Sequence, residues 1–211
     1  NNEEAFLESI RIGIKYSNLD KLVTFGTTPT APHTGYGYIE SEKPLSSNKI
    51  SGERIIRFIE KPTISYDKEL IKDKKFSWNS GIFLFKASSI INQIKKYSPE
   101  ILEICLSSIK DQRYDLDFQR IDKKIFINCP NVSIDISVME KTKEGIVIPL
   151  NAGWSDIGDW NSVWENTKKD INGNAKIGEI LLKGTKNSYF RSENKLVVGL
   201  GVENLIVIDT E

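Results

Sequence analysis

The residues that could carry chemistry in this chain stand in short, widely separated stretches. Glu60 and Lys61 precede a proline, Asn79 and Gly81 enclose a serine, and Asp156 lies between two tryptophans. A lysine can hold a phosphate as a point charge, a glutamate can accept hydrogen bonds from vicinal sugar hydroxyls, and an amide offers a donor and an acceptor. An aspartate can ligate Mg²⁺ beside phosphate oxygens. These residue types suit a phosphorylated sugar.

A fourth stretch, Thr34-Gly35-Tyr36-Gly37-Tyr38, adds glycines and tyrosines. A glycine such as Gly37 lets the backbone approach a flat ligand, and tyrosines can line a sugar.

Each stretch also has a purely structural interpretation. Glu60 and Lys61 could be a solvated ion pair at a strand end, and Asn79 to Gly81 a simple turn. Asp156 could cap a helix, and the stretch around Gly37 could be a tight turn into a strand. Asp135 is expected to be a first-turn charge that favours a helix dipole.

The elements that must position these residues follow from apolar periodicity. Helices are expected over residues 3–17, 67–74, 87–97, 99–109, 133–141 and 159–166. Strands are expected over residues 22–26, 36–39, 54–60, 76–85 and 145–150, and residues 125–128 are expected to be extended or to lead into the next helix. Strands that alternate with helices predict an α/β domain with a mostly parallel sheet. Beyond Asn172 the pattern contains only short apolar runs between Gly, Asn and Ser, which predicts a small β-only tail.

Composition excludes several classes of protein. Lys+Arg and Asp+Glu both number 29 in 211 residues, so no basic surplus points to nucleic acid. No apolar run is long enough to span a bilayer, and we expect a cytoplasmic protein. Cys105 and Cys129 lack metal-site spacing and are expected to be buried thiols. His33 is the single histidine, so a histidine-cluster zinc site is excluded.

Together, the four stretches resemble the sugar-phosphate nucleotidyltransferase family. That family carries, in order, a Glu-Lys-Pro, an Asn-[Ser/Thr]-Gly and a Trp-x-Asp-x-Gly. Further segments of the chain resemble the mannose-1-phosphate guanylyltransferase branch of that family. They are residues 22–26 (Leu-Val-Thr-Phe-Gly), 34–39, 133–135 (Ser-Ile-Asp), 138–141 and 203–207.

The resemblance implies an incomplete, Rossmann-like nucleotidyltransferase sheet that lacks its N-terminal strands, over residues 1–170. Residues 171–211 would begin a β-helix-like extension. Glu60 would contact mannose hydroxyls and Lys61 the 1-phosphate, with Asn79 and Gly81 holding the sugar above Gly37. Asp156 would be one of two Mg²⁺ ligands. Mannose 1-phosphate and GTP would yield GDP-mannose and pyrophosphate.

The chain departs from the family in lacking a Gly-x-Gly-x-Arg loop and the first Mg²⁺ aspartate. The only methionine is Met139, so we expect a trimmed or partial chain that is inactive alone. It could pair with a missing N-terminal half or form a homo-oligomer. Two alternatives stay open: a non-catalytic protein that binds a sugar phosphate or a partner, and a uridylyl- or thymidylyltransferase for glucose 1-phosphate.

Overall fold

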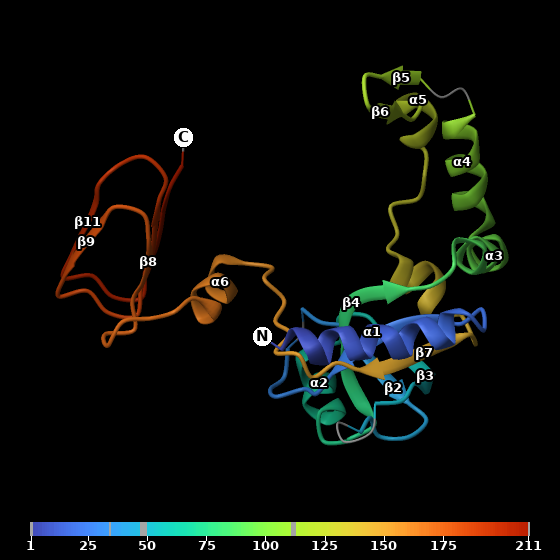
Figure 1. Cartoon of the computed structure of the whole chain (residues 1–211), viewed down its shortest axis with the longest axis horizontal. Helices are drawn as coiled ribbons and strands as arrows, with labels where there is room; N and C mark the ends of the chain where they lie inside the picture. The colour runs from blue at the N-terminus through green and yellow to red at the C-terminus, as the bar shows by residue number, and fades with distance from the viewer. Residues whose placement is uncertain (1, 34, 47–49, 111–112, 211) are drawn as a thin grey trace. The chain divides into compact units, whose positions relative to one another are not determined.

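The computed structural model describes residues 2–33, 35–46, 50–110 and 113–210, and the chain divides into two compact units between Trp154 and Ser155. The first unit is built on a five-stranded sheet, and the second on a helix and a coil of short strands (Figure 1). Within the described residues, no helix is long and apolar enough to cross a membrane.

The elements of the first unit alternate along the chain. Its helices are α1 (Glu3–Ser17), α2 (Ile64–Leu70), α3 (Ala87–Tyr97), α4 (Pro99–Ile109), α5 (Lys123–Phe126) and the π-helix η1 (Asp135–Met139). Its sheet contains β1 (Leu22–Thr27), β2 (Tyr38–Ser41), β3 (Glu53–Ile59), β4 (Phe76–Leu84) and β7 (Gly145–Pro149). A separate antiparallel pair is formed by β5 (Arg113–Asp115) and β6 (Phe118–Arg120).

The five strands lie in the order β1-β4-β2-β3-β7, and β7 returns to pair with β1. The β1–β7 pair is parallel, whereas every other described pairing among these strands is antiparallel. The prediction of a mostly parallel sheet is therefore wrong. The short apolar run of β1 indicates a strand covered on both faces, which is typical of parallel sheets, but an antiparallel strand can be covered in the same way.

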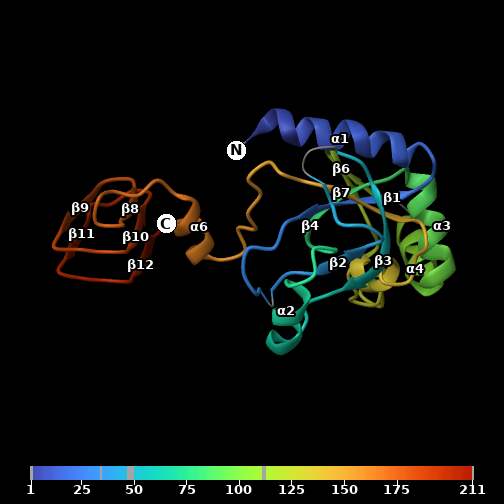
Figure 2. The ribbon, with the colours of Figure 1, turned by 90° about the horizontal axis from the view of Figure 1, so that it is seen from below.

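Both faces of the sheet are indeed covered. On one face, Val23, Phe25 and Ile148 pack with the apolar side of α1, which lies along the sheet in Figure 2. On the other face, Leu22 and Val147 join a cluster that includes residues of α3 and η1. A third cluster lies between β2, β4 and α2. The buried core thus holds the ends of β2, β3 and β4 in fixed positions.

Three local expectations change in the structure. Residues 125–128 were expected to be extended or to lead into the next helix, but residues 125 and 126 are the end of the helix α5. The Asp122 carboxylate caps this helix by accepting from the Lys124 and Ile125 N–H groups at 2.8 and 3.2 Å. The helix expected over residues 133–141 is the shorter π-helix η1. The helix expected over residues 67–74 begins earlier, directly after the Pro62 turn, as α2.

The second unit contains the predicted β-rich tail. Its elements are α6 (Trp160–Asn166), β8 (Ala175–Ile177), β9 (Ile180–Lys183), β10 (Tyr189–Ser192), β11 (Val197–Leu200) and β12 (Ile206–Asp209). β10 pairs in parallel with β8 and β12, and β11 pairs in parallel with β9. The strands therefore stack as successive coils, as Figure 2 shows. Trp160 of α6 stacks on the buried ring of Tyr189 at 6.0 Å between ring centroids.

Candidate functional site

The strand register brings three of the predicted residues together. Gly37 directly precedes β2 and Glu60 directly follows β3, and these strands pair with Tyr38 opposite Ile59. β2 also pairs with β4, and the Asn79 N–H donates to the Gly37 carbonyl at 2.8 Å. A Cβ atom at Gly37 would lie 2.7 Å from Glu60 Oε2 and 3.4 Å from the Asn79 Cβ. Glycine is therefore required at position 37 for the carboxylate to lie there.

The side chain of Asn79 is held by a network of hydrogen bonds. Its Oδ1 accepts from the Thr24 hydroxyl at 2.9 Å and from the Gly81 N–H at 3.2 Å. Its Nδ2 donates to Asp135 Oδ1 at 3.1 Å. The two acceptor positions of Oδ1 are thus occupied, whereas Nδ2 carries a second hydrogen that can still be donated. The network fixes the amide with one donor available for a ligand.

Asp135 is a site residue that the sequence interpretation missed. Asp135 is the first residue of η1, so its negative charge also interacts favourably with the helix dipole, as the sequence predicts. Its carboxylate nevertheless accepts from Asn79, and its negative charge acts on Glu60. The signal that could have found it is the Ser-Ile-Asp segment shared with the guanylyltransferase branch. We call Gly37, Glu60, Lys61, Asn79, Gly81 and Asp135 the Asn79 cluster.

Glu60 lies in an electrostatic setting that favours its neutral form. Partial burial is the largest cause that raises the pKa of Glu60, and the negative charges of Asp135 and Glu140 raise it further, while Lys61 opposes them. Lys61 Nζ lies 3.7 Å from Glu60 Oε1, and the lysine side chain is 65% exposed. An exposed positive charge beside a carboxylate suits the binding of an anionic group.

The aromatic residues near Gly37 divide into two groups. Tyr36 stacks on His33 at 3.7 Å between ring centroids and contacts Trp78 and Trp154 edge-on. Tyr38, in contrast, is fully buried and donates its hydroxyl to Asp67. Burial raises the pKa of Tyr38 to about 12, with the Asp67 hydrogen bond as the next cause. The sequence suggested that Tyr38 could line a sugar, but its burial excludes this role. Thr34 of the same stretch lies outside the described residues.

Asp156 lies in the second unit, in the loop before α6, so the structure places it only within that unit. The cap of α6 is Asp159, whose carboxylate accepts from the Ser162 N–H at 2.7 Å. The alternative role of Asp156 as the cap of that helix is therefore not supported. Asp156 is exposed, and its carboxylate oxygens are the hard donors that Mg²⁺ takes.

The described part of the chain contains no group of three His, Cys, Asp or Glu side chains that could hold a metal by itself. Asp156 thus fits Mg²⁺ as a single donor that needs phosphate oxygens or other ligands beside it. Cys105 and Cys129 are free thiols and are half-buried rather than fully buried.

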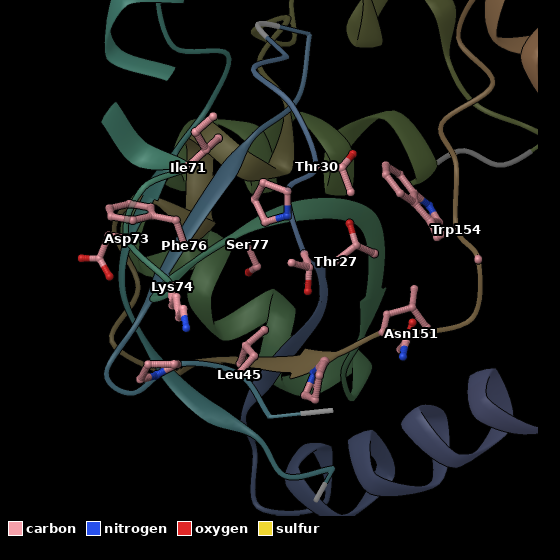
Figure 3. Close-up of a pocket in the computed structure, with 17 residues that line it drawn as sticks. Thr27, Thr30, Leu45, Ile71, Asp73, Lys74, Phe76, Ser77, Asn151 and Trp154 are labelled. Atoms are coloured by element: carbon pink, nitrogen blue, oxygen red, sulfur yellow. The ribbon is translucent and has the colours of Figure 1, made fainter. Parts of the chain in front are cut away.

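The structure also contains a pocket of about 530 Å³ that no member of the Asn79 cluster lines. Figure 3 shows its walls, which come from the end of β1 and the residues after it, from Pro44 and Leu45, from the start of β4 and the residues before it, and from the end of β7 and the residues after it. We call it the strand-end pocket. It lies at the carboxyl ends of the parallel strands β1 and β7, where α/β proteins commonly bind ligands.

Comparison with known proteins decides the family. A model of the nucleotidyl transferase family matches residues 3–173. The chain belongs to the nucleotidyl transferase family. It is 41% identical over 209 residues to the mannose-1-phosphate guanylyltransferase of Escherichia coli and 43% identical over 213 residues to that of Salmonella montevideo. The matches cover 99% and 100% of this chain but 45% of each relative, so the chain spans about half their length.

Two solved structures also resemble this member of the nucleotidyl transferase family. One, from Thermus thermophilus, is described as a mannose-1-phosphate geranyltransferase; it has a TM-score of 0.79 and 26% identity, and the match covers 100% of this chain and 60% of that one. The other is described as a mannose-6-phosphate isomerase from Helicobacter pylori, with a TM-score of 0.65, 32% identity and coverage of 74% and 59%. The predicted family and the mixed α/β fold with a β-rich tail are therefore confirmed.

The raised pKa of Glu60 predicts a pH-dependent change in stability for Glu60→Gln. Between the ordinary glutamate pKa and the raised one, the folded chain binds more protons than the unfolded chain, so wild-type stability falls as pH rises through this window. Below the ordinary pKa the carboxyl is neutral and the variant should match the wild type. Above the raised pKa the variant should be slightly more stable, because glutamine carries no charge.

Urea unfolding midpoints measured at acidic and neutral pH test this expectation. Glu69→Gln, at a position on α2 where the side chain is exposed, is the matched control and should give no pH-dependent difference. A Glu60→Gln variant that loses stability relative to the wild type as pH rises would contradict the assignment of this charge environment.

Proposed function

We propose that this chain supplies the sugar-phosphate-binding part of a mannose-1-phosphate guanylyltransferase. The observation that carries the proposal is the convergence of Gly37, Glu60, Lys61 and Asn79 at the adjoining ends of β2 and β3 and within β4. Relatives named mannose-1-phosphate guanylyltransferase that match the whole chain support the same substrate. Mannose 1-phosphate carries both hydroxyl groups and a phosphate. The cluster offers Glu60 and Asn79 as hydrogen-bond partners for the hydroxyls and Lys61 as a cation for the phosphate.

Five members of the cluster have roles that their geometry permits. The Glu60 carboxylate accepts hydrogen bonds from two neighbouring mannose hydroxyls. The remaining Nδ2 hydrogen of Asn79 is donated to another hydroxyl, while Asp135 and Thr24 keep the amide oriented. The Lys61 ammonium turns away from Glu60 to contact the phosphate. The absence of a side chain at Gly37 leaves room for the Glu60 carboxylate.

The full reaction would join the sugar 1-phosphate to the α-phosphorus of GTP and release pyrophosphate. Such phosphoryl transfers depend on positioning and charge neutralisation rather than on acid–base groups. A Mg²⁺ ion bound with Asp156 as one ligand would neutralise phosphate charge. Lys61 would add a second positive charge at the sugar phosphate. No Gly-x-Gly-x-Arg loop occurs in the sequence, so we propose that a separate segment supplies the nucleotide site.

Lys61→Ala tests the phosphate role directly. Both residues carry a Cβ atom, so the left-handed backbone at position 61, with φ of 46°, is equally strained in each. We expect the affinity for mannose 1-phosphate to fall about tenfold, or ~1.4 kcal/mol, in isothermal titration calorimetry. Lys68→Ala, which removes an exposed lysine of α2, should leave it unchanged. Equal affinities of the two variants would refute the role of Lys61.

A second experiment separates an enzyme from a non-catalytic binding protein. GDP-mannose formation from GTP and mannose 1-phosphate is measured with the chain alone and with a separately produced nucleotide-binding segment of a relative. We expect no turnover by the chain alone and turnover by the mixture. Turnover by the chain alone would refute the need for a separate nucleotide site. Binding of mannose 1-phosphate with no turnover in either case favours the non-catalytic alternative.

A further inference from the structure

A carboxylate is fully buried beside the strands that carry the Asn79 cluster. Asp67 of α2 has no exposed surface, and its Oδ1 accepts from the hydroxyl of Tyr38, which is also fully buried. Among the described residues, Asp67 Oδ2 has no hydrogen-bond partner. Burial of a carboxylate is costly because it removes hydration. An apolar residue would therefore suit this position better if α2 only had to pack on the sheet.

The strand register places Tyr38 next to the site. Tyr38 on β2 pairs with Ile59 on β3 and with Trp78 on β4. One position further along these strands are the site residues Gly37, Glu60 and Asn79. A group that fixes the position of Tyr38 therefore also fixes the strand ends from which these three residues extend.

The same hydrogen bond restrains the segment that contains Lys61. Residues 60–63 connect β3 to α2, and the Asp67 N–H donates to the Thr63 carbonyl at 2.9 Å. Because this connection is short, the position of α2 restricts the backbone of Lys61, which has a φ of 46°. The Asp67 carboxylate ties α2 to β2 and thereby limits where the Lys61 ammonium can reach.

Apolar packing of α2 does not provide this restraint by itself. Leu70 of α2 packs with Tyr38 and Phe76, and Figure 2 shows α2 next to β2. Such contacts are non-directional, whereas a hydrogen bond requires a particular distance and angle. The donor is present at neutral pH, because burial raises the pKa of Tyr38 to about 12, with the hydrogen bond to Asp67 as the next cause.

We propose that Asp67 is a positioning residue for the Asn79 cluster. It touches no ligand itself, since it has no exposed surface. It acts by holding the Tyr38 hydroxyl, so that Gly37, Glu60 and Lys61 keep their spacing; binding sites generally depend on such supporting hydrogen bonds. The consequence for ligand affinity rests on the proposed function, whereas the consequence for the strand ends does not.

Calorimetric titration of mannose 1-phosphate against Asp67→Ala measures the effect on binding. We expect about fivefold weaker binding than for the wild type, which is within the range for the loss of one hydrogen bond. Asp67→Asn keeps an oxygen that accepts from the Tyr38 hydroxyl, so its affinity should return to within about twofold of the wild type. Ile90→Ala is the structural control, because it truncates a buried side chain of α3 in a different cluster. It should lower the melting temperature and leave the affinity unchanged.

Hydrogen exchange of the free chain gives a second measurement that needs no ligand. The Asn79 N–H donates to the Gly37 carbonyl at 2.8 Å, and the Leu150 N–H donates to the Gly26 carbonyl at the same distance. Asp67→Ala should accelerate exchange of the Asn79 amide about threefold or more relative to that of Leu150. Ile90→Ala should change both amides by the same factor.

The outcomes separate this inference from the proposed function. If the wild type does not bind mannose 1-phosphate, the proposed function fails, and exchange at the Asn79 amide still decides the inference. Equal affinities of the wild type and Asp67→Ala overturn the inference while the proposed function stands. So does an equal loss of affinity in Ile90→Ala, or unchanged relative exchange at Asn79.

A second variant covers the case in which Asp67→Ala does not fold. Tyr38→Phe/Asp67→Ala removes both partners, so neither is left buried without the other, which is the less destabilising change. It also removes the restraint, so the same losses of affinity and of protection at the Asn79 amide are expected. Wild-type values for both measurements would overturn the inference.

Discussion

Asn79→Ala is expected to lower the affinity for mannose 1-phosphate about tenfold. The substitution removes the free Nδ2 hydrogen that we assign to a mannose hydroxyl. It also releases the Asp135 carboxylate and the Gly81 N–H from the network that positions them. The lost bond joins a neutral amide to a neutral hydroxyl, which costs about 0.5–1.5 kcal/mol, or up to roughly tenfold in affinity. The release of Asp135 and Gly81 adds to this loss.

Calorimetric titration of mannose 1-phosphate against the purified variant measures this loss. Asn92→Ala is the matched control, because it truncates an exposed asparagine of α3. Far-ultraviolet circular dichroism and an unfolding curve should show that Asn79→Ala remains folded. The Thr24 hydroxyl keeps a partner in the Ile82 carbonyl at 3.1 Å, so the core loses little. An unchanged dissociation constant would remove Asn79 from the site.

Gly26→Ala is expected to destabilise the first unit by about 1–3 kcal/mol, the usual cost of overpacking a core. A Cβ atom at position 26 would lie 2.4 Å from Ser77 Oγ and 2.8 Å from Val147 Cγ2. These atoms belong to β4 and β7, which flank β1 on its two sides. The Ser77 Cβ atom would also lie only 2.9 Å away, so rotation of the Ser77 hydroxyl does not remove the clash. The closing glycine of the Leu-Val-Thr-Phe-Gly segment is thus required by packing.

Urea denaturation measures the free energy of unfolding for Gly26→Ala. Gly158→Ala is a suitable control, because its Cβ atom would meet no atom closer than 3.5 Å. We expect the control to change stability by no more than about 0.5 kcal/mol. A Gly26→Ala protein as stable as the wild type would show that β4 and β7 can separate freely around β1.

The site could be predicted from sequence to the extent that its residues stand at strand ends. Glu60 and Gly37 were expected near the end and the start of strands, and the structure confirms these positions. Their contact depends on the register of β2 against β3 and β4, which no local pattern specifies. Asp135 was not predicted as a site residue, because the helix dipole alone explains why a negative charge occurs in the first turn of a helix.

The direction of the strands could not be predicted for a related reason. Burial of β1 on both faces gives a continuous apolar run whether its neighbours are parallel or antiparallel. The connection between β2 and β3 is short enough to allow antiparallel pairing, but its residues 47–49 lie outside the described part of the chain. The family resemblance, by contrast, was confirmed, because ordered motifs are more specific than apolar patterns.

Lys61 has a left-handed backbone with φ of 46°, so its side chain lowers local stability while it supplies the positive charge that we propose binds the phosphate. A side chain in this conformation costs roughly 1 kcal/mol relative to glycine. A homologue that no longer binds an anion at this position could therefore gain stability through Lys61→Gly. The identity of this residue in any descendant would then record whether selection still acts on the Asn79 cluster.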